Sequence, residues 1–100
     1  MSNREAYYLE HLSLLGIPEH MHGGMLRYLL HGLPPGSFLT AVLSNDLREA
    51  VAYADEKNQS SLARYVVFLH NHAPLGAWGS PERVSEWIES FRLRDVEAGA

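Results

Sequence analysis

Glycine and proline divide this chain into short runs of helical periodicity, most densely between residues 17 and 58. Both residues interrupt helices, glycine because of its backbone entropy and proline because it lacks an amide donor. Between them, apolar residues recur every three or four positions, the period of a helix that packs by one face. No recognised catalytic signature falls in this stretch. The pattern predicts an all-α fold, a compact single domain of about five to six short helices, in which stretch 17–58 provides structure and a partner surface.

Capping residues indicate the limits of the first two helices. Ser2 or Asn3 can cap the first helix, and Gly16 ends it. The second helix begins at Pro18, because proline is tolerated at a first helical position, and it ends at Gly32. Two helices are therefore expected at the start of the chain.

Similar signals predict a third and a fourth helix. We interpret Ser37 as the cap of a short third helix. Asp46 followed by Glu49 resembles a capping box, which opens the fourth.

The last two helices follow from the second half of the chain. Asn58 or Ser60 can cap the fifth, which contains the apolar run 65–69. By propensity that run equally fits a buried strand, and we prefer a helix because no partner strands are evident elsewhere. Residues 80–82, Ser-Pro-Glu, combine a cap, a proline and an early acid, so they open the sixth helix.

Composition indicates one domain spanning residues 1–100, with residues 1–3 and 95–100 frayed. The chain is 46% hydrophobic and 20% charged, which is ordinary for a globular protein. Its net charge is −4, with no basic run that could neutralise a phosphate backbone. Direct binding to duplex DNA is therefore not expected.

The first sixteen residues contain acids and no long apolar core, so they predict neither a secretion signal nor a membrane span. The chain has no cysteine, which excludes disulfides, thiolate nucleophiles and cysteine-ligated zinc. We expect a cytosolic protein, a monomer or a homodimer, without membrane contact.

The histidine pairs His20-x-His22 and His70-x-His72 raise the question of a metal site. Residues two apart on a helix point to nearly opposite sides, whereas chelation from a helix needs a spacing of four. We expect no metal and no cofactor. The nearest nucleophile pattern, Gly36-Ser37, lacks a G-x-S-x-G elbow, and the paired acids lie on polar faces, so we expect no enzyme.

Two polar surfaces are candidates for contact with a partner. The pair Gly23-Gly24 is costly inside a helix, at about 1 kcal/mol per glycine, and this cost indicates close approach of another helix or of a partner chain. Around it, His20, Arg27 and His31 recur at helical period and form the first surface, opposite the apolar side of the same helix.

The second surface surrounds the start of the fourth helix. It consists of Asn45, Asp46, Arg48, Asp55 and Glu56. Capping and solvated charge explain these residues without a partner. Alternatively, the acids could occupy an arginine- or lysine-lined nucleic-acid groove on another protein, where complementary charge aids specificity and association rate.

Residues 17–50, IPEHMHGGMLRYLLHGLPPGSFLTAVLSNDLREA, and the segment WGSPERVSEWIE resemble a family of small proteins encoded by phages and mobile elements of proteobacteria. The resemblance spans roughly three quarters of the chain and consists mainly of structural punctuation. In size and acidity the chain is similar to anti-CRISPR inhibitors of type I CRISPR-Cas surveillance complexes. The resemblance implies a protein that binds the crRNA-guided complex and blocks target DNA binding; it implies no functional residue.

Two other functions remain open from the sequence. One is a helical phage regulator that binds a transcription factor or DNA, with residues 16–32 in a helix-turn-helix-like arrangement. The other is a homo-oligomeric phage structural component that buries Trp78 or Met25 between copies.

Overall fold

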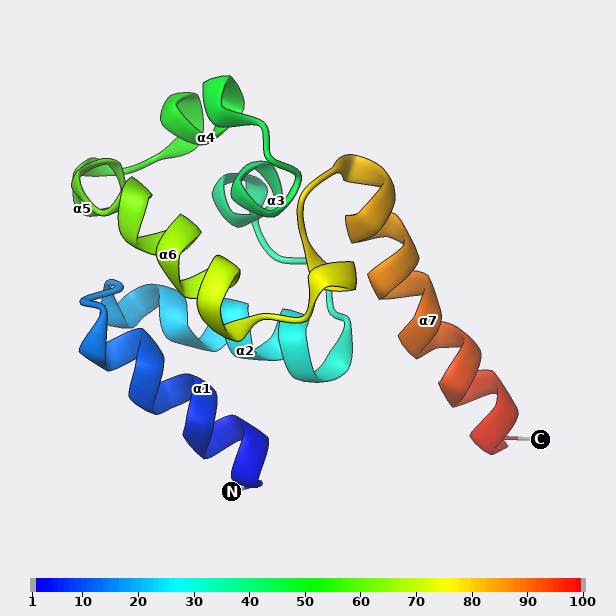
Figure 1. Cartoon of the computed structure of the whole chain (residues 1–100). Helices are drawn as coiled ribbons and strands as arrows, with labels where there is room; N and C mark the ends of the chain where they lie inside the picture. The colour runs from blue at the N-terminus through cyan, green and yellow to red at the C-terminus, as the bar shows by residue number, and fades with distance from the viewer. Residues whose placement is uncertain (1, 100) are drawn as a thin grey trace.

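The structure is a computed structural model that describes residues 2–99, with side chains as far as Asp95, and it contains no strand within that range (Figure 1). The predicted all-α fold is confirmed, but the described residues form seven α-helices and two 3-10 turns, more than the five to six helices expected. The elements are α1 (Asn3–Leu14), η1 (Glu19–Met21), α2 (His22–His31), α3 (Ser37–Leu43), α4 (Leu47–Tyr53), α5 (Glu56–Ser60), α6 (Leu62–His72), η2 (Leu75–Ala77) and α7 (Pro81–Gly99).

The helices form one globule around a shared core. Helix α1 packs against α2 and α6, α3 packs against α4, and α7 packs against η2 and α3. Figure 1 shows α4 and α5 at the end of the molecule far from both termini, while the last turns of α7 extend past the body. The described helices include none that is long and apolar enough to cross a membrane.

The core contains large side chains from α1, α2, α3 and α6. Its most fully buried members are Leu12, Met25, Tyr28, Leu29, Leu43, Tyr65, Phe68 and Leu69. Burial raises the pKa of the Tyr28 and Tyr65 hydroxyls, and both donate hydrogen bonds, as buried polar groups must. Met25 is fully enclosed in its own chain, so the idea that copies bury Met25 between them is wrong.

Most predicted capping residues act as expected. The Ser2 hydroxyl accepts a hydrogen bond from the Glu5 amide at 3.0 Å, and the Ser80 hydroxyl accepts one from the Arg83 amide at 3.1 Å. Gly16 and Gly32 end α1 and α2 with φ angles of +73° and +64°, a left-handed conformation that suits glycine.

Two predicted helix starts are wrong. Pro18 precedes the short turn η1, and α2 begins only at His22, so the predicted second helix is divided. The first residue of α3 is Ser37, and its N-cap is Gly36, with no side-chain hydrogen bond. In both cases the sequence correctly indicated a helix boundary nearby. The boundary itself differs by four residues for α2 and by one residue for the cap of α3.

The predicted caps of the fifth helix are also wrong. Asp55 caps an extra short helix, α5, by accepting a hydrogen bond from the Asn58 amide at 2.8 Å. The side chain of Asn58 is 3% exposed and accepts a hydrogen bond from the Tyr65 hydroxyl. The side chain of Asn58 therefore links α5 to α6 and does not cap a helix. Residues 65–69 lie within α6, which confirms the helix and excludes the strand.

Helix α7 reaches Gly99, past the point after which the sequence predicts fraying. The fraying of residues 1–3 and 95–100 stays a prediction, and residues 1 and 100 lie outside the described residues.

Gly32 is the point where α7 meets the end of α2. A β-carbon built on Gly32 would lie 2.5 Å from Cδ1 of Phe91, and the φ angle of Gly32 is left-handed. Gly32→Ala is therefore expected to lower the free energy of unfolding by about 1–3 kcal/mol, which urea denaturation would measure. As a control, Gly76→Ala places its β-carbon in open space and should change stability by less than about 0.5 kcal/mol. Equal stability of the two variants would contradict this account of Gly32.

A histidine pair joins α1 to α6. The rings of His11 and His72 stack with centroids 3.9 Å apart, and the Tyr7 hydroxyl lies 2.7 Å from Nδ1 of His72. Burial lowers the pKa of His72, and the charge of His11 lowers it further. Protonation of His72 is thus less favourable in the folded chain than in the unfolded one.

Stability should consequently depend on pH near neutrality. Because the pKa of His72 is lower in the folded state, its contribution is complete above the ordinary histidine pKa of about 6.5 and is lost as pH falls below it. Chemical denaturation should give lower stability at pH 5.5 than at pH 7.5. His11→Gln should flatten this dependence, and His70→Gln, an exposed position on α6, should leave it unchanged. An identical slope in His11→Gln would refute the assignment.

Candidate partner-binding surface

Helix α4 is the most exposed regular element near the predicted surfaces. Of its seven residues only Ala50 is buried. Leu47, Val51 and Tyr53 are 66%, 43% and 58% exposed. Because Ala50 is the only buried residue of α4, apolar side chains on both flanks of this helix are exposed to solvent. Exposed apolar side chains of this kind are typical of an interaction site.

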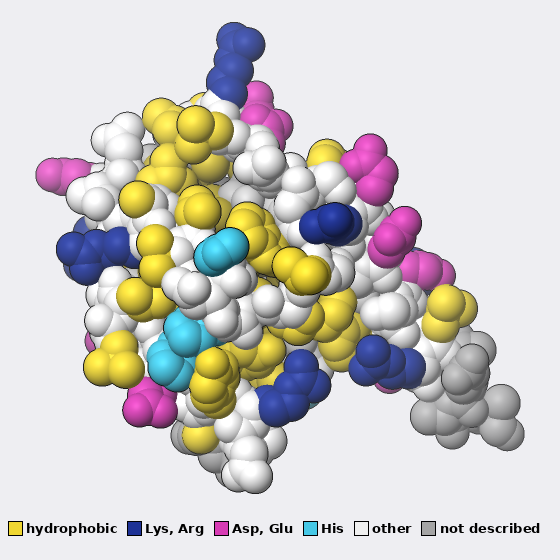
Figure 2. Space-filling view, in the orientation of Figure 1, with side chains coloured by type: hydrophobic (Ala, Val, Ile, Leu, Met, Phe, Trp, Pro, Cys, Tyr) yellow, Lys and Arg dark blue, Asp and Glu magenta, His cyan; other side chains and the backbone are white. Residues whose placement is uncertain are grey.

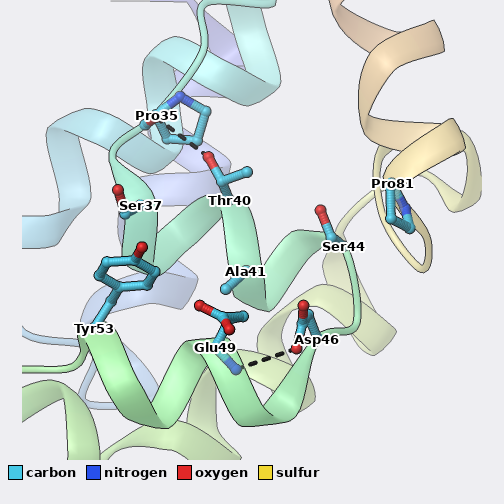
Figure 3. Close-up of a pocket in the computed structure, with 9 residues that line it drawn as sticks. All are labelled: Pro35, Ser37, Thr40, Ala41, Ser44, Asp46, Glu49, Tyr53 and Pro81. Carbon is cyan, nitrogen blue, oxygen red and sulfur yellow. Dashed lines mark hydrogen bonds between the residues drawn. The ribbon is translucent and has the colours of Figure 1, made fainter.

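A groove runs between α3 and α4 (Figure 3), with a volume of about 340 Å³. Ser37, Thr40 and Ser44 follow each other at helical spacing along α3, and α4 contributes Asp46 at its N-cap, Glu49 and Tyr53 at the same spacing. The full lining is Pro35, Ser37, Thr40, Ala41, Ser44, Asp46, Glu49, Tyr53 and Pro81. The short side chain of Ala41 leaves the space between the two helices open.

The groove is negatively charged. No lysine, arginine or histidine lines it, whereas Asp46 and Glu49 both do. One oxygen of Asp46 accepts a hydrogen bond from the Glu49 amide at 3.1 Å. Among the described residues the ion pairs are His20–Asp55 and Arg92–Glu89, so neither groove carboxylate has a cationic partner in the described part of the chain.

The other flank of α4 faces α6, and apart from Asn45 and Asp46 at its edge its lining is apolar. Leu47, Leu62 and Val66 line a small hollow there, and Val51 lies one turn along α4 from Leu47. We call Leu47, Val51 and Val66 the α4–α6 patch. Figure 2 shows hydrophobic side chains gathered over this side of the molecule. The acidic groove and the apolar patch therefore border the same helix.

Asp55 and His20 meet at a corner between η1 and α5. His20 Nε2 lies 3.0 Å from Asp55 Oδ2, and both side chains are about half exposed. The backbone amide of Asn58 lowers the pKa of Asp55, and the hydrogen bond and charge of His20 lower it further. Glu56 and Lys57 line the same open hollow. The structure thus unites His20, from the first predicted surface, with Asp55 and Glu56 from the second.

The first predicted surface is consequently divided. Arg27 and His31 line a shallow hollow beside Glu5, while His20 lies on η1 against Asp55. A β-carbon on Gly24 would contact Leu39 of α3 at 3.4 Å, so this glycine faces a neighbouring helix. His20 does not share a helix face with Arg27 and His31, because the turn at η1 changes the rotational phase of the residues before α2. That these residues contact a partner stays a prediction.

The second predicted surface is divided as well: Asn45, Asp46 and Arg48 lie at the start of α4, whereas Asp55 and Glu56 lie at the start of α5. Asn45 has a φ angle of +60° in the exposed turn before α4, Asp46 caps that helix, and Arg48 is exposed on it. The groove residues Ser37, Thr40, Ser44, Glu49 and Tyr53 are not among the contact residues that the sequence predicted. Their spacing on two successive short helices is visible in the sequence, but its meaning depends on how those helices pack.

The histidine pairs separate in the structure. His22 Nε2 bonds the Ile17 carbonyl at 2.8 Å, whereas its neighbour His20 contacts Asp55. His72 contacts Tyr7, and His70 is exposed. The described residues include no group of three or more histidine, aspartate or glutamate side chains able to hold a metal ion.

No protein-family model, curated protein or solved structure matches this chain. The resemblance to small phage proteins therefore stays a prediction.

The two roles of Asp46 can be separated by substitution. Asp46→Ala removes the cap of α4 and should lower the free energy of unfolding by about 1 kcal/mol. Asp46→Asn keeps a capping oxygen and removes only the charge, so its stability should stay within a few tenths of a kcal/mol, roughly, of the original. Thermal and urea denaturation of both variants would test this, and equal losses would show that charge rather than capping is responsible.

Proposed function

We propose that this protein is a phage-encoded inhibitor, of the anti-CRISPR kind, that binds a bacterial type I CRISPR-Cas surveillance complex in the host cytoplasm. It blocks target DNA binding by covering a surface of that complex, with no reaction and no cofactor. The resemblance of residues 17–50 to small phage proteins supports the identity of the partner.

One observation carries the proposal: the exposure of α4, with an acidic groove on one flank and an apolar patch on the other. Surfaces that handle nucleic acid present lysine and arginine to phosphates. The acidic groove can compete for such a surface because opposite potentials accelerate encounter and favour specific pairing. The apolar patch supplies the burial that charge alone does not, at about 25 cal/mol per Å² removed from water.

Affinity purification tests the proposal directly. The tagged full chain, expressed in a bacterium with a type I CRISPR system, should recover the surveillance subunits in fixed proportion, and added target DNA should compete with it. The affinity should fall as salt rises. Recovery of a transcription factor, or of nothing above background, would refute the proposal.

Substitution of the α4–α6 patch should weaken this binding. Leu47→Asp places a charge among apolar side chains, yet an acid in the first turn of a helix is tolerated by the helix dipole. We expect at least about a tenfold loss of affinity, which corresponds to roughly 1.4 kcal/mol. The control is Leu75→Asp on η2, where the side chain is 76% exposed. Equal affinity of the two variants would exclude the patch as a contact.

A further inference from the structure

We propose that the groove between α3 and α4 binds the guanidinium group of an arginine side chain presented by the partner protein. This inference deepens the proposed function, because it rests on the chain acting through a protein partner, and it identifies the chemistry that one site would recognise. The occupant is an arginine-bearing protein segment.

The charge of the groove favours a cation. Asp46 and Glu49 are three residues apart, and Figure 3 shows both carboxylates on the side of α4 that faces α3. Asp46 uses one oxygen to cap α4, which leaves its other oxygen and the carboxylate of Glu49 without a cationic partner among the described residues. A guanidinium ion fits this arrangement, because it carries five N–H donors and forms charge-assisted hydrogen bonds with carboxylates.

The neutral lining suits the rest of an arginine side chain. The ring of Tyr53 stands at one end of the groove, 58% exposed, where a cation can lie against its face. Ala41 and Pro35 provide apolar surface for the methylene stem. The hydroxyl of Thr40 donates to the Pro35 carbonyl at 3.3 Å, so its remaining lone pairs are acceptors. The groove, at about 340 Å³, thus has room for an arginine side chain, together with the charge and the aromatic wall that suit one.

Arginine fits better than the other candidates. A phosphate or carboxylate would meet two carboxylates and no basic side chain, which excludes anions. Lysine offers three donors from a compact and strongly hydrated ammonium, and it does not stack on a ring as a planar guanidinium does. The carboxylate and hydroxyl acceptors of the groove, together with the ring of Tyr53, therefore favour arginine over lysine.

The groove can be tested by NMR titration of the full chain with three blocked peptides, Ac-Gly-Arg-Gly-NH2 and its lysine and citrulline counterparts. Citrulline has nearly the shape of arginine but no charge. The arginine peptide should shift the amide signals of Ser44, Glu49 and Tyr53, with binding at least about threefold tighter than lysine and no shift with citrulline. Equal shifts with citrulline, or none with arginine, would overturn the inference.

Variants of the groove residues test whether the partner binds through this groove. Glu49→Gln keeps the size of the side chain and should weaken the arginine peptide and the surveillance complex at least about fivefold each. Tyr53→Leu should weaken both as well. Glu10→Gln, an exposed acid on α1, is the control and should change neither. Circular dichroism of each variant shows whether its fold is retained.

The outcomes separate the two proposals. If the arginine peptide binds the groove but no surveillance subunit is recovered, the proposed function is wrong and the groove assignment stands. If the complex is captured with unchanged affinity by Glu49→Gln and by Tyr53→Leu, the groove assignment is overturned and the proposed function stands.

Discussion

Tyr28 holds the two halves of the chain together. Its ring is fully buried on α2, and its hydroxyl donates to the Ala77 carbonyl at 2.6 Å. Its own carbonyl accepts a hydrogen bond from Nε1 of Trp87 at 3.0 Å. These two bonds fix η2 and α7 against α2, and an unsatisfied buried partner would cost about 1–3 kcal/mol. The position of Pro81, which borders the acidic groove, follows from them because it opens α7.

The exposure of α4 has a physical cause in its length and composition. Seven residues make two turns, too few for a helix to be stable in isolation, so the cap at Asp46 and the packing of Ala50 must hold it. Ala50 is buried beside Val42 of α3 and Leu62 of α6, so its small side chain lets α4 lie close to both helices. The helix therefore stays at the surface with Leu47 and Tyr53 in solvent.

Local signals in the sequence predicted what local interactions determine. Ser2 and Ser80 cap helices because a hydroxyl needs only an amide three residues away, and Gly32 ends one because its own φ angle allows it. Asn58 was misassigned because its side chain bonds Tyr65, a contact that no local pattern reveals. The groove was missed for the same reason: Ser37 and Glu49 belong to one site only after α3 and α4 pack together.

Placing acids and apolar groups on one short helix resolves a conflict that faces any small binding protein. Exposed apolar side chains give affinity through burial but also favour self-association. The groove beside α4 has the carboxylates of Asp46 and Glu49 and no basic side chain in its lining, so two copies meeting groove to groove would bring like charges together. A basic partner would instead be attracted by these carboxylates while it covers the α4–α6 patch. Under the proposed function, the same acids that oppose self-association would favour a basic partner.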